Sequence, residues 1–302
     1  MGADVDVSLA GPSDLSGEPV FSIVRPAVQT VPLVFASPHS GDTYPPEFVR
    51  SSRLPLNVLR RSEDAFVDRL VQAATDYGAP LLKARFPRVF VDPNREPYEL
   101  DPAMFDTPLP DFVNRDSPRV AAGLGTVARV VATGEDIYAR RLSFEEARRR
   151  IENHYFPYHA ALKDLLAETL DRFGCYLLID CHSMPSVGGP MDADPGRRRL
   201  DFVLGDCFGT TCATAVVDLA ERTLQARGHS VHRNVPYAGG FTTRHYGRPN
   251  ERGHALQIEV NRSLYMDEGR IEPSATMSTM VTDLTLLIAA LADAAPRMID
   301  AR

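Results

Sequence analysis

The chain has 302 residues, of which 44% are hydrophobic and 24% are charged. This is the composition of a globular protein that can bury a full core as one large domain or two small ones. The net charge of −7 and the isoelectric point near 5.6 argue against nucleic acid or an anionic membrane surface as the main partner.

The N-terminal segment and the cysteines indicate the compartment. Residues 1–18 are rich in Gly, Ser, Pro and Asp and are predicted to be a loosely ordered lead-in to a single domain over residues 19–302. The lead-in has no basic residue and no long apolar run, so we expect neither a secretory signal nor a transit peptide. The longest apolar stretch, near the C-terminus, is too short and interrupted to span a bilayer. Four cysteines without a CxxC pair suit reduced thiols, and we expect a cytoplasmic protein: Cys175, Cys181, Cys207 and Cys212.

The first half of the chain predicts a β-then-α unit followed by a long loop. Residues 31–37 form a continuous apolar run typical of a buried strand, and residues 56–77 have helical periodicity that ends at Gly78. Residues 81–92 predict one or two further strands. The Pro- and Asp-rich residues 93–112 lack any periodicity, and a loop of this length inside a compact domain is usually functional.

The second half alternates strands with helices. Ser143 and Glu146 form a capping box that opens a helix to residue 173, which Pro157 is expected to kink and Gly174 to end. The further predicted elements are strands at 175–180, 201–206, 229–234 and 254–260, helices at 211–227 and 273–295, and a glycine loop at 237–247. This alternation predicts a three-layer α/β/α sandwich with a central parallel or mixed sheet and helices on both faces.

Polar side chains lie at the ends of several predicted strands. His39 follows the strand at 31–37, Asn94 and Arg95 follow residue 92, His182 follows the strand at 175–180, and Glu259 lies late in the strand at 254–260. In open α/β sheets, ligands bind outside the carboxyl ends of the strands. Two histidines and a carboxylate are the ligand set of a catalytic zinc, which keeps a fourth position open.

The third ligand has three candidates. Asp42 stands three residues after His39, whereas Glu63 and Asp64 lie at the start of the predicted helix. On a helical wheel Glu63 falls on the apolar face and Asp64 at its edge, so both can point inward. Acidic residues in a first helical turn are also favoured by the helix dipole, behind Ser62 as a cap, without any ligand role. Spacing alone does not choose among the three.

Glu259 is the best candidate for a general base. The period of two in residues 254–260 places Leu256 and Ile258 on one face of the strand and Gln257 and Glu259 on the other. The carboxylate would then face a polar cavity from a rigid element. The alternative is an ion pair with a nearby arginine such as Arg262.

Two further segments offer donors for an anionic substrate. Asn94 and Arg95 form a pair suited to a carboxylate, because a guanidinium binds it bidentately. In the glycine loop, Thr243, Arg244 and His245 offer additional donors, with a solvated turn as the alternative reading.

Other catalytic schemes are less consistent with the sequence. Cys181 and His182 are adjacent on a strand and therefore point to opposite faces, so they cannot pair as nucleophile and base. There is no GxSxG elbow, phosphate-binding glycine loop or dinucleotide fingerprint. His154 and His159, on the long helix, are expected to be structural, with His159 able to approach the site.

Four motifs follow one another over nearly the whole chain after the lead-in: SPHSGDTYPPEF, RFPRVFVDPNREP, LLIDCHSMPS and GGFTTRHYGRPNERGHALQIEVNRSLYM. In this order they resemble the motifs of the N-formylglutamate amidohydrolase (deformylase) family. The resemblance implies a fold related to zinc carboxypeptidases and aspartoacylases, with one zinc ion per chain. Carried over residue by residue, it implies His39, His182 and Asp64 as zinc ligands, Asn94 with Arg95 as a substrate-carboxylate site, and Glu259 as the catalytic carboxylate.

The implied reaction is the hydrolysis of N-formyl-L-glutamate to formate and L-glutamate, a step of histidine degradation. The chain departs from the family pattern in SEDAF, where Ser62 stands at the first of two acidic positions. The alternatives are a zinc amidohydrolase acting on another small anionic N-acyl amino acid, and a non-catalytic protein that binds an anionic metabolite.

Overall fold

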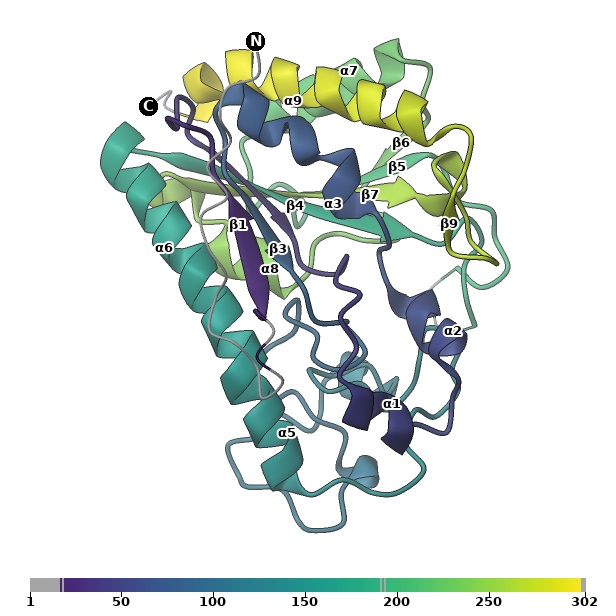
Figure 1. Cartoon of the computed structure of the whole chain (residues 1–302). Helices are drawn as coiled ribbons and strands as arrows, with labels where there is room; N and C mark the ends of the chain where they lie inside the picture. Colours follow the sequence, from purple (N-terminus) through teal and green to yellow (C-terminus); the bar gives the residue numbers. More distant parts are fainter. Residues whose placement is uncertain (1–16, 18, 191, 193, 300–302) are drawn as a thin grey trace.

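The computed structural model describes residues 17, 19–190, 192 and 194–299. A seven-stranded sheet runs through the centre between two layers of helices (Figure 1). Apart from Gly17, the predicted lead-in at residues 1–18 lies outside the described residues. The sheet strands are β1 (Phe21–Val24), β2 (Leu33–Ser37), β3 (Leu81–Ala84), β4 (Tyr176–Met184), β5 (Phe202–Gly205), β6 (Val231–Arg233) and β7 (Gly253–Asn261).

The α-helices are mostly short, with two long ones that cover opposite faces of the sheet. They are α1 (Pro46–Ser51), α2 (Leu56–Leu59), α3 (Val67–Leu70), α4 (Pro118–Ala121), α5 (Phe144–Arg150), α6 (Phe156–Phe173), α7 (Thr214–Ala226), α8 (Phe241–Tyr246) and α9 (Met277–Ile299). A small two-stranded ribbon joins β8 (Met266–Asp267) to β9 (Glu272–Pro273).

The strand order is β1-β3-β2-β4-β7-β5-β6, and the sheet is mixed. The strands β3, β2, β4 and β7 run parallel, whereas β1 pairs antiparallel with β3 and β5 antiparallel with β7. The prediction of a three-layer sandwich around a mixed sheet is therefore confirmed. Because β2, β4 and β7 are parallel neighbours, their carboxyl ends meet at one edge of the sheet.

Alternate residues of each central strand pack into different layers. In β2, Leu33 and Phe35 belong to the core under α3, α7 and α9, whereas Val34 and Ala36 belong to the core under α6. The helix α9 is long and apolar enough to cross a membrane by length and composition. Its buried face, which includes Leu284 in the core against the sheet, shows that the apolar character also serves the fold.

The predicted helix over residues 56–77 is wrong, because the segment divides into α2, two 3-10 turns and α3. Phe66 adopts a left-handed conformation with φ 66° and separates the pieces. The backbone of the break bonds to distant groups instead of to a helix: Asp64 N–H donates to His39 O (2.9 Å), and Ala65 O accepts from Tyr265 (3.0 Å). These tertiary bonds replace the helical ones that the periodicity predicts.

Two further expectations need correction. Residues 88–92 are not a strand, because Phe90 N–H and Val91 N–H both donate to Pro87 O and close a turn. The helix from Ser143 keeps the predicted capping box but passes through a π-helical turn, η4 (Ile151–Tyr155), just before Pro157. A π-turn accommodates a proline that lacks the donor an α-helix needs, and such turns occur often at functional sites.

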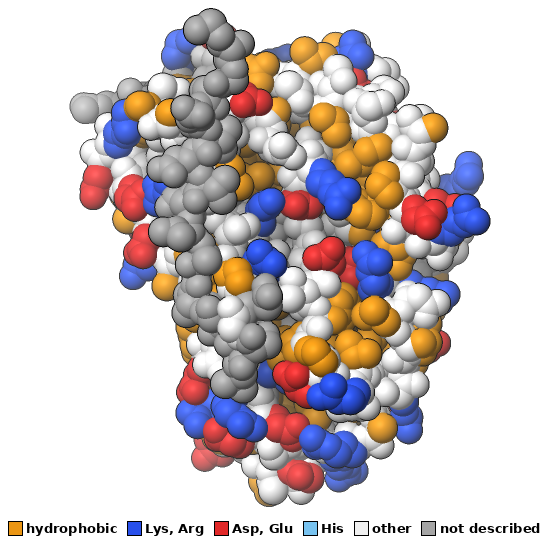
Figure 2. Space-filling model, viewed as in Figure 1, with side chains coloured by type: hydrophobic (Ala, Val, Ile, Leu, Met, Phe, Trp, Pro, Cys, Tyr) orange, Lys and Arg blue, Asp and Glu red, His pale blue; other side chains and the backbone are white. Residues whose placement is uncertain are grey.

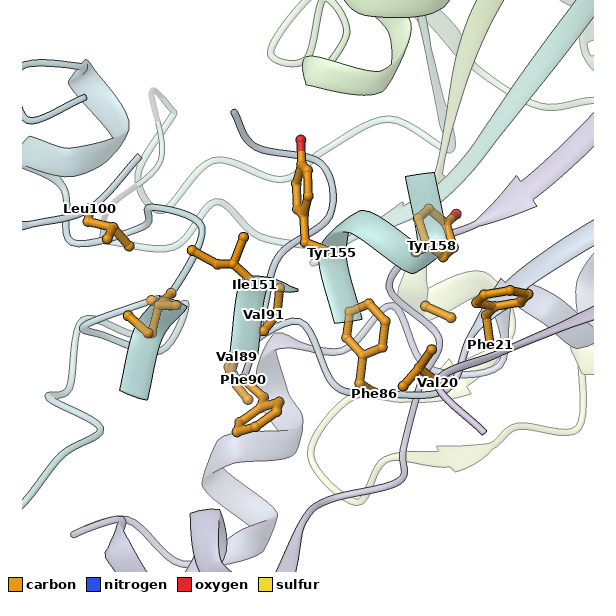
Figure 3. Packing of buried hydrophobic residues seen from close by; sticks show 14 of the residues in the cluster. Val20, Phe21, Phe86, Val89, Phe90, Val91, Leu100, Ile151, Tyr155 and Tyr158 are labelled. Carbon is orange, nitrogen blue, oxygen red and sulfur yellow. The ribbon is translucent and has the colours of Figure 1, made fainter. Parts of the chain in front are cut away.

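The loop excursion after residue 92 is not loosely attached. Leu100 of the excursion belongs to the same buried apolar cluster as Ile151 and Tyr155 of η4 (Figure 3). The core thus extends beyond the sheet and holds the excursion rigidly beside the strand ends. On the face shown in Figure 2, acidic and basic side chains are interspersed with hydrophobic ones, so its described side chains form no continuous basic stripe.

Candidate metal centre and its cavity

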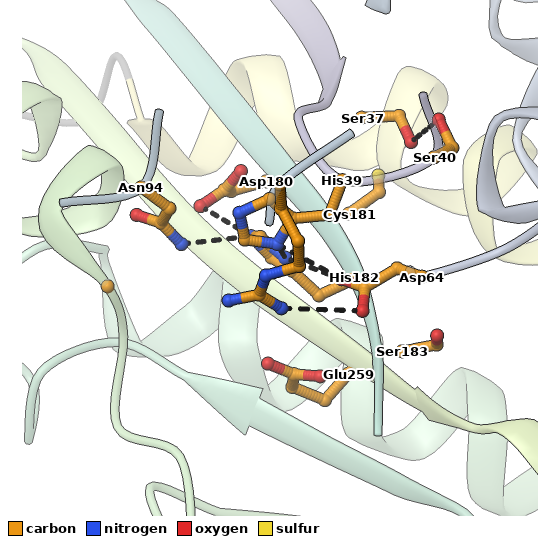
Figure 4. A network of polar contacts seen from close by, with 12 residues as sticks. Ser37, His39, Ser40, Asp64, Asn94, Asp180, Cys181, His182, Ser183 and Glu259 are labelled. Carbon is orange, nitrogen blue, oxygen red and sulfur yellow. Dashed lines mark hydrogen bonds and ion pairs between the residues drawn. The ribbon is translucent and has the colours of Figure 1, made fainter. Parts of the chain in front are cut away.

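The side chains at the carboxyl edge of the sheet come from four separate segments. His39 follows β2, His182 lies near the end of β4, and Glu259 lies near the end of β7. Asp64 enters from the break before α3 (Figure 4). All four side chains are buried.

Three of these residues form a tight triangle of ligand atoms. His39 Nδ1 and His182 Nδ1 lie 3.2 and 3.1 Å from Asp64 Oδ2, and the two nitrogen atoms are 3.1 Å apart. Three corners of a tetrahedron around zinc, with bonds of about 2.0–2.1 Å, are about 3.3 Å apart. Within the described ranges, no other three His, Cys, Asp or Glu side chains converge in this way. The donor set therefore fits a zinc ion.

The outer nitrogen of each histidine faces a carboxylate. His39 Nε2 lies 2.7 Å from Asp92 Oδ1, and His182 Nε2 lies 3.0 Å from Asp180 Oδ2. Burial lowers the pKa of His182, but the charge of Asp180 outweighs it and raises the pKa well above its usual value. Carboxylates in these positions fix the ring orientation, leaving both Nδ1 atoms directed at the centre.

Asp64 is held by cations on its other oxygen. Its Oδ1 accepts a hydrogen bond from Arg262 Nη2 (3.0 Å) and lies 3.6 Å from Arg88 Nη1. Burial raises the pKa of Asp64, yet hydrogen bonds from His182 and His39 outweigh it and keep the pKa well below its usual range. The carboxylate is therefore ionised, as a metal ligand must be.

The two other candidates for the third ligand lie elsewhere. Asp42 is exposed, and Glu63 pairs with Arg60 (3.0 Å) and accepts a hydrogen bond from Tyr44 (2.8 Å). The geometry thus selects Asp64 from the three carboxylates that the sequence left open.

Glu259 faces the cavity, as the period of two predicts. The apolar residues Leu256 and Ile258 lie in the opposite core, and Glu259 Oε1 accepts a hydrogen bond from Gln257 Nε2 (2.9 Å). Burial raises the pKa of Glu259 to about 7, against the lowering effect of His182. The alternative ion pair with Arg262 is not formed, because Arg262 bonds to Asp64 and Ser183 instead.

A cavity of about 350 Å³ opens over these groups. Such a volume suits a small organic substrate. Its lining is shared by polar side chains from the sheet edge and by the loop backbone at residues 236–240. The charged and amide side chains in the lining are His39, Arg88, Asp92, Asn94, Arg95, Arg119, His182, Asp192, Gln257, Glu259 and Arg262.

Asn94 and Arg95 both reach this cavity. Thr242 N–H donates to Asn94 Oδ1 (2.9 Å), which fixes the amide, and Tyr155 of η4 donates to Arg95 O (2.8 Å). His159 supports the same loop through a 2.7 Å contact between Nε2 and Pro93 O, a structural role beside the site. The segment formed by η4 and α6 therefore positions this pair at the cavity.

The substrate-binding role of Thr243, Arg244 and His245 stays a prediction, and in this structure the three residues lie outside the cavity lining. Residues 241–246 form α8, and the side chains of Thr243, Arg244 and His245 do not line the cavity. Thr243 is fully buried, Arg244 bonds to Gly239 O (3.0 Å) and His245 stacks on Phe241. Residues 236–240, which precede α8, line the cavity instead of these three side chains.

Several lining residues were missed from the sequence. Three of them lie within the quoted motifs: Arg88, Asp92 and Arg262. Their charge was the feature of the sequence that could have identified them as site residues. Arg119 lies in the short helix α4, after the excursion, and no pattern in the sequence marks it. Ser62 also lines the cavity and accepts a hydrogen bond from Ala132 N–H (3.1 Å).

Comparison with known proteins identifies the family. The family model described as N-formylglutamate amidohydrolase matches residues 31–266. The chain belongs to the N-formylglutamate amidohydrolase family. As a member of this family it is a hydrolase that acts on an amide, and the matched range contains every residue of the triangle and Glu259.

Individual members of the N-formylglutamate amidohydrolase family agree with this assignment. N-formylglutamate deformylase of Pseudomonas aeruginosa is 31% identical over 242 residues, which cover 79% of this chain and 83% of the relative. The deformylase of Pseudomonas putida is 31% identical over 248 residues, with the same coverage. The crystal structure of N-formylglutamate amidohydrolase from Ralstonia eutropha JMP134 superimposes with a TM-score of 0.84 at 39% identity, covering 92% of this chain and 98% of that one.

Proposed function

We propose that this protein is a zinc-dependent N-formylglutamate deformylase, which hydrolyses N-formyl-L-glutamate to formate and L-glutamate. The observation that carries the proposal is the triangle of His39, Asp64 and His182 beside Glu259, at one end of a cavity that also contains guanidinium groups. The named relatives support the substrate, because two deformylases cover most of the chain.

The metal would be held by His39 Nδ1, Asp64 Oδ2 and His182 Nδ1. Bound zinc supplies Lewis acidity, which polarises a carbonyl group and makes a water molecule more acidic. Asp92 and Asp180 orient the two imidazoles through their outer nitrogens, and Arg262 holds the second oxygen of Asp64. Two histidine nitrogens and one carboxylate oxygen would occupy three of the four positions of a tetrahedral zinc site and leave the fourth open.

Glu259 is the proposed general base and acid. Its buried carboxylate takes a proton from the attacking water and returns that proton to the leaving nitrogen of L-glutamate. A pKa of about 7, which burial raises, suits both transfers near neutral pH. Gln257 holds one oxygen of the carboxylate, which leaves the other to face the reaction.

Asn94 and Arg95 are proposed to bind the carboxylate next to the amide. Arg95 is buried beside the cavity, and a planar guanidinium binds a carboxylate through two parallel hydrogen bonds. Such binding positions the formyl group over the metal site and lowers the entropic part of the barrier. A cytoplasmic location and a place in histidine degradation remain part of this proposal.

The proposal is tested by measuring formate release from N-formyl-L-glutamate by the purified protein, after chelation and after zinc is added back. We expect release to be lost on chelation and restored by zinc. An inactive zinc-loaded protein would disprove the proposed substrate and would direct the search to other N-acyl amino acids. Activity that survives complete metal removal would disprove the proposed zinc dependence.

A further inference from the structure

Arg119 is a cation in the cavity wall without an assigned partner. It belongs to the short helix α4 and lines the same cavity as Glu259 and Arg95. Among the described residues, no carboxylate lies within ion-pair distance of its guanidinium, although the other arginines of the lining, Arg88, Arg95 and Arg262, lie within 4.0 Å of a carboxylate. Arg119 is exposed, so water can solvate its charge, and its guanidinium can pair with an anionic ligand that enters the cavity.

The backbone fixes Arg119 beside Arg95. Leu124 O accepts a hydrogen bond from Arg95 Nε (2.9 Å), and Leu124 N–H donates to Arg119 O (2.8 Å). Ser117 caps the start of α4 and also donates to Glu99, which anchors the helix to the excursion. A single residue, Leu124, therefore bonds to both arginines, and both arginines line the cavity.

Among the described residues, Asp92 is the carboxylate within ion-pair distance of either of these two arginines. Arg95 Nε and Nη1 bond only to carbonyl oxygens, and its Nη2 is 3.6 Å from Asp92. Asp92 is already engaged by Arg88 (2.8 Å) and His39 (2.7 Å). Burial lowers the pKa of Arg95 to about 10, and the charge of Arg119 adds to the lowering. Two neighbouring cations with so little compensation favour two carboxylates over one.

We infer that Arg119 binds the second carboxylate of an N-acyl dicarboxylic amino acid and thereby selects this class of substrate. Arg95 and Asn94 take the carboxylate next to the amide, and Arg119 takes the side-chain carboxylate. This inference rests on the proposed function and assigns the specificity of the same site. An N-acyl amino acid with a neutral side chain lacks the group that Arg119 binds.

The test compares N-formyl-L-glutamate with N-formyl-L-glutamine, its neutral isostere, in wild-type protein and Arg119→Ala. Loss of a charge-assisted pair lowers affinity about 10- to 100-fold. We expect kcat/KM for N-formyl-L-glutamate to fall by about that factor, mostly through KM, and the value for N-formyl-L-glutamine to change less than about threefold. Arg119→Lys keeps the charge and should recover part of the loss. Arg149→Ala, an exposed arginine of α5 outside the cavity lining, is the matched control.

An equal change for both substrates, or no change for either, would overturn the role of Arg119. A binding measurement keeps this test separate from the proposed reaction. Glutarate, a dicarboxylate that cannot be hydrolysed, should bind wild-type protein about 10- to 100-fold more tightly than Arg119→Ala in calorimetry, whereas butyrate should bind both alike. If N-formyl-L-glutamate is not hydrolysed but glutarate shows this difference, the reaction is wrong and the anion site stands. Equal glutarate affinities overturn the site itself.

Discussion

His182 and Glu259 are register partners on the adjacent parallel strands β4 and β7. Two pairs earlier in the same register, and therefore on the same face, Asp180 lies opposite Gln257, so the outer partner of His182 and the hydrogen-bond partner of Glu259 are paired as well. Side chains at paired positions point to the same side of a sheet. Two rigid strands thus hold a proposed metal ligand and the proposed base side by side.

Replacing Glu259 with Gln should lower kcat about 10²- to 10⁴-fold, because the amide cannot accept the proton from water. The amide oxygen can still accept the hydrogen bond from Gln257, so the fold and the metal content should stay unchanged. Steady-state kinetics and metal analysis on the same preparation check both expectations. A variant with wild-type kcat and full zinc would rule Glu259 out as the base.

Asp92→Asn should weaken zinc binding about 10- to 100-fold, because the variant loses the charge that orients His39 and holds Arg88. Competition with a chelator of known zinc affinity measures the change. Asp101→Asn is the control, since Asp101 also pairs with an arginine, Arg129, but lies outside the cavity lining. Equal zinc affinities of Asp92→Asn and wild type would contradict the role of Asp92.

Gly240→Ala should disturb substrate binding without straining the backbone, because the φ of Gly240 is −86°, a value that alanine can adopt. A Cβ at Gly240 would overlap the side-chain amide of Asn94, and Gly240 N–H is held by Gln257 Oε1 (2.7 Å), so Asn94 must give way. A displacement near 1 Å costs about 10²-fold in kcat/KM. Gly269→Ala serves as the control, because its nearest contact is Asp267 Oδ1 at 3.4 Å. Unchanged kinetics in Gly240→Ala would show that the position of Asn94 is not critical.

The capping box predicts a pH-dependent contribution to stability. The ion pair with Arg140, together with hydrogen bonds from Ser143, lowers the pKa of Glu146 to about 2. Because the folded pKa lies below the unfolded one, the stabilisation is present above about pH 4.3 and is lost as the pH falls toward 2. Glu146→Gln should therefore lower the free energy of unfolding by about 1 kcal/mol at pH 7.

Denaturant titrations of wild-type protein and Glu146→Gln at several pH values measure this difference. Gln can still accept the hydrogen bond from Ser143 N–H, so the difference should report the lost charge, which solvent screens in part because the Arg140 side chain is mostly exposed. The two curves should converge near pH 2. A difference that stays constant from pH 7 to pH 2 would show that the charge of Glu146 does not contribute.

Local patterns were sufficient for the sheet and for half of the site. The alternation in residues 254–260 predicts which side of β7 carries Glu259, because the period of a strand is a property of its own backbone. His39 and His182 were identifiable for the same reason, since each stands where an apolar run ends. The capping box at Ser143 and Glu146 depends on four consecutive residues and was equally visible.

Long-range contacts decided the rest. The choice of Asp64 over Asp42 and Glu63 depends on the interruption of the helical segment at Phe66. Hydrogen bonds to His39 and from Tyr265, distant in the sequence, stabilise this interruption. Helical periodicity in residues 56–77 could not anticipate that break, because local pattern records which faces are apolar and not where backbone groups find their partners. Arg119 and Arg95 are held near each other by hydrogen bonds that both make to Leu124, which lies in a loop without hydrophobic periodicity. Motifs and strand ends in the sequence thus indicated the chemistry, and tertiary hydrogen bonds determined which carboxylate and which cations surround it.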